Sequence, residues 1–104
     1  MAVLYVTECS QLGYTTNGQQ LIMAPFMPPV AEQTVGVSGT ATSSNTFSAL
    51  THFVMVNCDS TCSLAWSSTS TTVSAVTTAQ RMSQYETRFY SVNPGGSVSV
   101  VSNT

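Results

Sequence analysis

The chain has 104 residues and a formal net charge of −2, from two arginines and four carboxylates, with no lysine. A domain of this size buries roughly 60–65% of the surface that its unfolded chain exposes, so a single core is expected. Two arginines cannot supply the several phosphate contacts on which binding to nucleic acid or to an anionic membrane surface depends. No apolar run approaches the ~18 residues needed to span a bilayer. We therefore exclude nucleic acid and membranes as partners.

The composition predicts a folded chain with a neutral surface. Ser and Thr make up about 30% of the residues, and charged residues are far below the usual share of about 25%. The 42% of hydrophobic residues supplies enough apolar surface for a core. The start, MAVLYVTECS, lacks the basic region of a secretory signal, so we expect folding in the cytoplasm.

A first strand is predicted at residues 3–6, and the segment after it is unusual. Residues 21–32, LIMAPFMPPVAE, contain three prolines, which cannot donate hydrogen bonds to a sheet. Two interpretations stay open: the segment covers one end of its own domain, or it is an arm that docks on another subunit or protein. For the second, the candidate partner-interface residues are Leu21, Ile22, Met23, Phe26 and Met27.

The rest of the chain alternates with the period of two that is typical of strands. Val35 and Val37 share one face of residues 33–39, residues 53–56 form a short apolar run, and residues 62–66 alternate again. The Ser/Thr-rich residues 67–78 oppose a helix. The pattern predicts an all-β fold of about seven or eight strands, a single small β-sandwich or jelly-roll-like domain with an extended, proline-rich N-terminal segment. We expect residues 1–30 to form the N-terminal strand and extended arm, and residues 31–104 the β-sandwich domain.

Two short linkers carry turn signals. Pro94, Gly95 and Gly96 separate residues 89–92 from residues 97–100, which is the pattern of a hairpin. Residues 57–62, NCDSTC, are rich in turn formers and also allow a hairpin, with its two cysteines facing each other.

Residues 51–66, THFVMVNCDSTCSLAW, contain the best candidates for reactive chemistry. A zinc site would need a second pair of ligands beside Cys58 and Cys62, and only His52 and Cys9 are at hand. His52 with Asp59 and a serine lacks a recognisable nucleophile turn. We therefore predict no catalytic residue, metal or cofactor. An odd number of cysteines leaves at least one thiol free, and a bridge between Cys58 and Cys62 is the main alternative to three buried free thiols.

The few remaining polar and aromatic candidates have simple interpretations. Glu86 and Arg88 are expected to pair with each other or with a neighbouring chain. Trp66 on an alternating strand is expected in the core. If Trp66, Tyr85 or Tyr90 is exposed instead, it can stack on a sugar ring.

Residues 31–101 resemble the small decoration, or cement, proteins of tailed bacteriophages. The likeness lies in AEQTV, in the Phe-Val strand that leads through Asp-x-x-Cys-Ser into a short apolar strand, in Arg-Met, in a Phe-rich strand and in the late Gly-Gly turn. Members of that family often have basic residues where this chain has Met55 and Ser97.

The resemblance implies a β-sandwich on the outside of an icosahedral head. It implies that the major capsid protein is the partner, that the protein is a homo-oligomer, commonly a trimer, and that it bridges neighbouring capsid subunits in the virion. The alternative is a receptor- or carbohydrate-binding β-sandwich module of a phage tail or fibre.

Overall fold

The computed structural model describes residues 2–14, 17, 19–25 and 27–103, with the side chains of residues 14 and 20–24 left out. This part of the chain forms ten strands and no helix, so it holds no helix that could cross a membrane. The strands are β1 (Ala2–Cys9), β2 (Leu12–Tyr14), β3 (Gln20–Pro25), β4 (Ala31–Val37), β5 (Thr42–Ser43), β6 (Phe53–Cys58), β7 (Cys62–Ser67), β8 (Gln80–Met82), β9 (Thr87–Ser91) and β10 (Ser97–Ser102).

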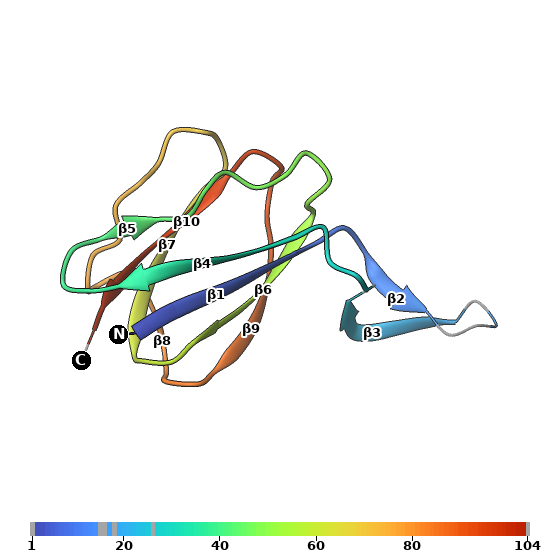
Figure 1. Cartoon of the computed structure of the whole chain (residues 1–104), viewed down its shortest axis with the longest axis horizontal. Helices are drawn as coiled ribbons and strands as arrows, with labels where there is room; N and C mark the ends of the chain where they lie inside the picture. Colours follow the sequence, from blue (N-terminus) through green and yellow to red (C-terminus); the bar gives the residue numbers. More distant parts are fainter. Residues whose placement is uncertain (1, 15–16, 18, 26, 104) are drawn as a thin grey trace.

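Eight of these strands build two four-stranded antiparallel sheets (Figure 1). The first sheet has the order β4-β1-β6-β9, and the second has the order β5-β10-β7-β8. The all-β prediction is confirmed, and the two sheets pack as a small β-sandwich. The eight strands of the sandwich agree with the predicted seven or eight, and β2 and β3 form a further pair outside it.

Alternation along the strands decides which side chains enter the core. In β6, Val54 and Val56 are buried, whereas Phe53 and Met55 on the other face are half-buried. A strand turns successive side chains to opposite faces, so each sheet offers one apolar face to the space between the layers. That space is filled chiefly by Leu4, Val6, Val35, Val37, Phe47, Val54, Val56, Leu64, Met82, Val98 and Val100.

The strand at the N-terminus belongs to the sandwich. β1 lies between β4 and β6 in the first sheet, with Leu4 opposite Val35 on one side and Cys58 on the other. The expected boundary after residue 30 grouped this strand with the arm. Its pairing places it in the middle of a sandwich sheet instead, so the part outside the two sheets begins after Cys9.

Both predicted hairpins are wrong. β6 pairs with β1 and β9, and β10 pairs with β5 and β7, so each of these strands already has both of its edges occupied. A strand has only two edges, so β7 cannot pair with β6, and β9 cannot pair with β10. Residues 59–61 and 92–96 carry the chain from one sheet to the other.

Gly95 and Gly96 make the second of these crossings possible. Gly95 has a φ of +81°, which side chains disfavour. A Cβ on Gly96 would lie 2.4 Å from the carbonyl oxygen of Ser67. The Gly-Gly pair is needed for a close approach to β7.

The proline-rich region pairs with the segment before it. β2 and β3 form a separate two-stranded antiparallel sheet, with Leu12 opposite Pro25. Figure 1 shows this hairpin at the end of the sandwich where β1 stops and β4 starts, beside the sandwich and not across it. The longest dimension of the molecule is 47 Å.

Candidate functional site

The outer face of the second sheet is covered by the chain itself. Ser63 and Ser99 point away from the core, yet both are buried. The linker of residues 68–79 lies against them: Ala75 N–H donates to the Ser99 hydroxyl at 3.0 Å, and the Ser63 hydroxyl donates to the Thr77 carbonyl at 3.3 Å. Small hydroxyl side chains on this face let the linker approach closely. This side of the sandwich is closed.

The outer face of the first sheet has no such cover from the described residues, and we call it the open face. Its strand positions alternate with the core positions and carry larger apolar groups than those of the second sheet. Phe53, Met55 and Phe89 are half-buried, and Tyr5 is 48% exposed. The open face consists of Val3, Tyr5, Thr7, Glu32, Thr34, Gly36, Phe53, Met55, Asn57, Thr87, Phe89 and Ser91.

A shallow hollow of about 320 Å³ lies next to Tyr5 on this face. It runs between β1 and β4 and is lined by Tyr5, Thr7, Glu32 and Thr34, among others. Glu32 is the single ionisable carboxylate of the open face, and Gly36 nearby leaves open space where a side chain would be. The hollow offers hydroxyl groups and one aromatic ring to a partner.

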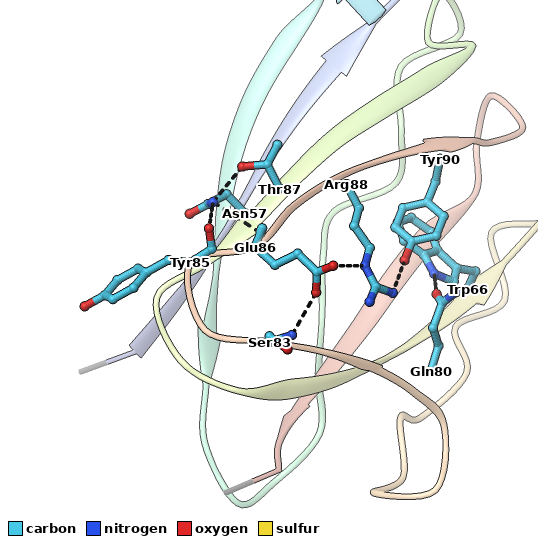
Figure 2. A network of polar contacts seen from close by, with 9 residues as sticks. All are labelled: Asn57, Trp66, Gln80, Ser83, Tyr85, Glu86, Thr87, Arg88 and Tyr90. Atoms are coloured by element: carbon cyan, nitrogen blue, oxygen red, sulfur yellow. Dashed lines mark hydrogen bonds and ion pairs between the residues drawn. The ribbon is translucent and has the colours of Figure 1, made fainter.

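A tight turn next to the open face holds an exposed aromatic residue. Tyr85 has a φ of +63° and is 69% exposed. Its N–H donates to the Cys58 carbonyl at 2.7 Å, and its carbonyl accepts from Asn57 Nδ2 at 3.2 Å. Asn57 Nδ2 is also 2.9 Å from Thr87 Oγ1, and Figure 2 shows the Tyr85 ring pointing away from this network.

An ion pair follows directly after this turn, which confirms the expected pairing of Glu86 with Arg88. Arg88 Nε lies 3.0 Å from Glu86 Oε2, and Arg88 donates to the Tyr90 hydroxyl at 3.2 Å (Figure 2). The hydrogen bond from Arg88 lowers the pKa of Glu86, and the hydrogen bonds with Glu86 and Tyr90 raise the pKa of Arg88. Glu86 also accepts from the Ser83 N–H at 3.0 Å, so the pair ties down the start of the turn.

Trp66 and Tyr90 pack on each other at the edge of the core. Their ring centroids are 4.7 Å apart, Phe47 lies 6.5 Å from Trp66, and Trp66 Nε1 donates to Gln80 at 3.3 Å. Trp66, which was expected in the core, is partly buried and packs against the core from its edge. A groove of about 250 Å³ beside Trp66 is lined by Ser67, Ser68, Ser91, Val92 and Asn93.

Glu8 is a buried carboxylate that the sequence reasoning did not single out. It is only 3% exposed, and its hydrogen-bond donors among the described residues are all uncharged. Its Oε1 accepts from Ser48 N–H and from the Thr51 hydroxyl, both at 2.8 Å, and its Oε2 accepts from Gln33 at 3.0 Å. Gln33 in turn accepts from the Asn45 N–H at 2.9 Å. The cluster holds residues 44–51 against the end of β1.

The His52 and cysteine stretch has a structural role. His52 is exposed just before β6, whereas Cys9, Cys58 and Cys62 are buried free thiols. The expectation of free thiols is confirmed. Burial and a hydrogen bond to Cys58 raise the pKa of Cys62 to about 12. The pKa of Cys9 is raised mainly by burial and to a smaller extent by the negative charge of Glu8. In the described residues, no three His, Cys, Asp or Glu side chains gather as metal ligands would.

The expected partner-interface residues fall mostly outside what the structure describes. Leu21, Ile22 and Met23 belong to the backbone of β3, but their side chains are not described. Phe26 lies outside the described residues. Met27 is exposed, after the end of β3.

No protein-family model, curated protein sequence or solved structure matches this chain. The candidate site therefore rests on geometry alone. Sequence reasoning proposed the proline-rich segment as the contact region and missed the open face. The signal was present in residues 53–57 and 87–91, whose outward positions carry Phe53, Met55 and Phe89 where an exposed sheet face usually has polar residues.

Proposed function

We propose that this chain is a non-enzymatic structural protein that binds the outside of a bacteriophage capsid and bridges neighbouring capsid subunits. The observation that carries the proposal is the difference between the two faces of the sandwich. One face is closed by the chain's own linker, whereas the open face carries Tyr5, Met55 and Phe89 with little charge around them. A one-sided sandwich suits a protein that lies on a larger surface.

The resemblance of residues 31–101 to phage decoration proteins supports the same role. It adds the expectation of a jelly-roll-like trimer on the capsid exterior, with the major capsid protein as its partner. A trimer that touches three sites gains effective concentration for the second and third contact, typically 10²–10⁴-fold in avidity. Modest contacts per subunit are then enough to couple neighbouring capsomers.

The proline-rich segment extends this reach in the proposal. Its apolar residues Leu21, Ile22, Met23, Phe26 and Met27 would lie on a capsid groove or beside a capsid strand. The position of the β2–β3 hairpin beside the sandwich supports an arm that reaches outward.

Co-sedimentation with empty heads tests the proposal. The heads are assembled from the major capsid protein encoded by the same genome, and the purified chain is added from nanomolar to micromolar concentration. We expect saturable binding at a fixed ratio to the capsid protein, with heat-unfolded chain as the control. Failure to bind at micromolar concentration would overturn the proposal.

The groove beside Trp66 is the feature that favours the alternative, a receptor- or carbohydrate-binding module of a tail or fibre. Against it, Trp66 already packs between Phe47 and Tyr90, which leaves little of the indole face for a sugar. Binding on a glycan array without binding to heads would favour the alternative.

A further inference from the structure

The two exposed aromatic side chains of the described residues lie around one asparagine. Among the Phe, Trp and Tyr side chains that the structure describes, only Tyr5 and Tyr85 are exposed, at 48% and 69%. Tyr5 is directly opposite Asn57 across β1 and β6. Asn57 Nδ2 donates to the carbonyl of Tyr85 at 3.2 Å (Figure 2). Two exposed tyrosines from distant parts of the sequence therefore adjoin Asn57: Tyr5 as its cross-strand neighbour, and Tyr85 through its backbone carbonyl.

Tyr85 is held in a backbone conformation that a tyrosine rarely adopts. A positive φ is unfavourable for a bulky residue and persists only where the surroundings impose it. Here the turn is fixed from three sides: the Cys58 carbonyl accepts from the Tyr85 N–H, Asn57 holds the Tyr85 carbonyl, and Glu86 accepts from the Ser83 N–H. The structure thus fixes the backbone of Tyr85, whose ring is exposed and does not belong to the core cluster. Tyrosine is enriched among the residues that dominate the binding energy of protein interfaces.

The charge distribution indicates the chemistry of the partner. Glu32 is the one ionisable carboxylate of the open face, and it lies on the edge strand β4. Glu86 and Arg88 neutralise each other beside the turn. Close to Asn57, the Asp59 carboxylate accepts from the Val3 N–H at 2.7 Å. The other groups around Asn57 are aromatic rings, hydroxyls and an amide, which match a neutral protein surface with an apolar centre. A strongly charged partner would lose its hydration here without gaining a countercharge.

We propose that the open face, with Tyr5 and Tyr85 as its anchors around Asn57, is the surface that binds the capsid protein, through a neutral and largely apolar patch of the shell. This inference rests on the proposed function and adds to it the face and the residues that make the contact. It also implies that binding depends little on salt, because few charges take part.

Three variants test the inference in the head-binding assay. Tyr5→Thr keeps a good strand former, and Tyr85→Asn keeps a residue that tolerates the positive φ, so both should stay folded. Val76→Ser is the matched control, because Val76 is equally exposed but lies on the linker that covers the second sheet. Circular dichroism and thermal unfolding check the fold of each variant.

We expect each tyrosine variant to bind heads at least about tenfold more weakly than the wild type, and Val76→Ser to bind like the wild type. The affinity of the wild type should change less than about threefold between about 50 and 500 mM salt, as expected for a neutral interface. If both tyrosine variants bind heads as tightly as the wild type, this inference is wrong and the proposed function still stands. Absence of wild-type binding would overturn both. If the tyrosine changes instead convert an oligomer to a monomer in size-exclusion chromatography without weakening head binding per subunit, the open face joins copies of this chain and the inference is wrong.

Discussion

Removal of the Glu8 carboxylate should destabilise the sandwich more than any other single polar change. In Glu8→Ala, the buried Thr51 hydroxyl and the partly buried Ser48 N–H lose their acceptor, and Gln33 loses a partner as well. A buried donor left without an acceptor costs about 1–3 kcal/mol. One buried and one partly buried donor predict a loss of about 2–4 kcal/mol in the free energy of unfolding, against a typical total of about 5–15 kcal/mol.

Glu8→Gln separates the hydrogen bonds from the charge. The amide oxygen can replace Oε1 and keep the bonds from Ser48 and Thr51, but the amide nitrogen then faces the donor group of Gln33. Gln33 cannot simply turn over, because its oxygen already accepts from the Asn45 N–H. We expect an intermediate loss of about 1–2 kcal/mol.

Urea unfolding followed by Trp66 fluorescence gives these free energies, and Glu32→Gln is the control because Glu32 is exposed on the same sheet. The control should lie within about 0.5 kcal/mol of the wild type. Hydrogen exchange of the Ser48 amide should accelerate in Glu8→Ala. A loss below about 1 kcal/mol for Glu8→Ala, with Ser48 still protected, would refute the view that this carboxylate holds residues 44–51 in place.

Three further predictions concern the backbone and the thiols. Gly96→Ala should lower the free energy of unfolding by at least about 2 kcal/mol because its Cβ meets the Ser67 carbonyl. Gly36→Ala, with open space around it, should change this free energy by less than about 0.5 kcal/mol. Equal effects of the two changes in urea unfolding would contradict the close approach at Gly96. Tyr85→Asn should raise the free energy of unfolding by about 0.5–1 kcal/mol, since asparagine accepts a positive φ more readily, and a loss of stability would argue against strain at this turn. The pKa of Cys62 rises from the ordinary 9.0 to about 12 on folding, so only the unfolded thiol ionises between these two values. The wild type should therefore lose stability relative to Cys62→Ala as the pH rises from about 9 towards 12. Parallel curves of stability against pH for the two proteins would contradict the burial of this thiol.

The alternation of apolar residues was enough to predict the sandwich. Val35, Val37, Val54 and Val56 occupy core positions that the period of two assigns to them. The same signal could not determine which strands pair. A hairpin between residues 89–92 and 97–100 fits the sequence, but only the assembled sheets show that β5 and β7 already occupy both edges of β10.

The candidate site was harder to predict because it depends on contacts between distant residues. Tyr5 and Tyr85 are far apart in sequence, and Asn57 relates them only after β1 and β6 have paired. In the sequence, Glu8 is one of four scattered carboxylates, and only the structure shows that residues 44–51 lie against it. Short-range patterns carry no information about such contacts.

The amount of this chain in purified virions tests the central claim most directly. Quantitative mass spectrometry of particles from the phage that encodes it measures its molar ratio to the major capsid protein. The proposal predicts the same ratio in every preparation of intact particles. The ratio should fall when the particles are disassembled and the capsid shell is recovered without surface proteins. Particles that contain no detectable copies of this chain would contradict the proposed function.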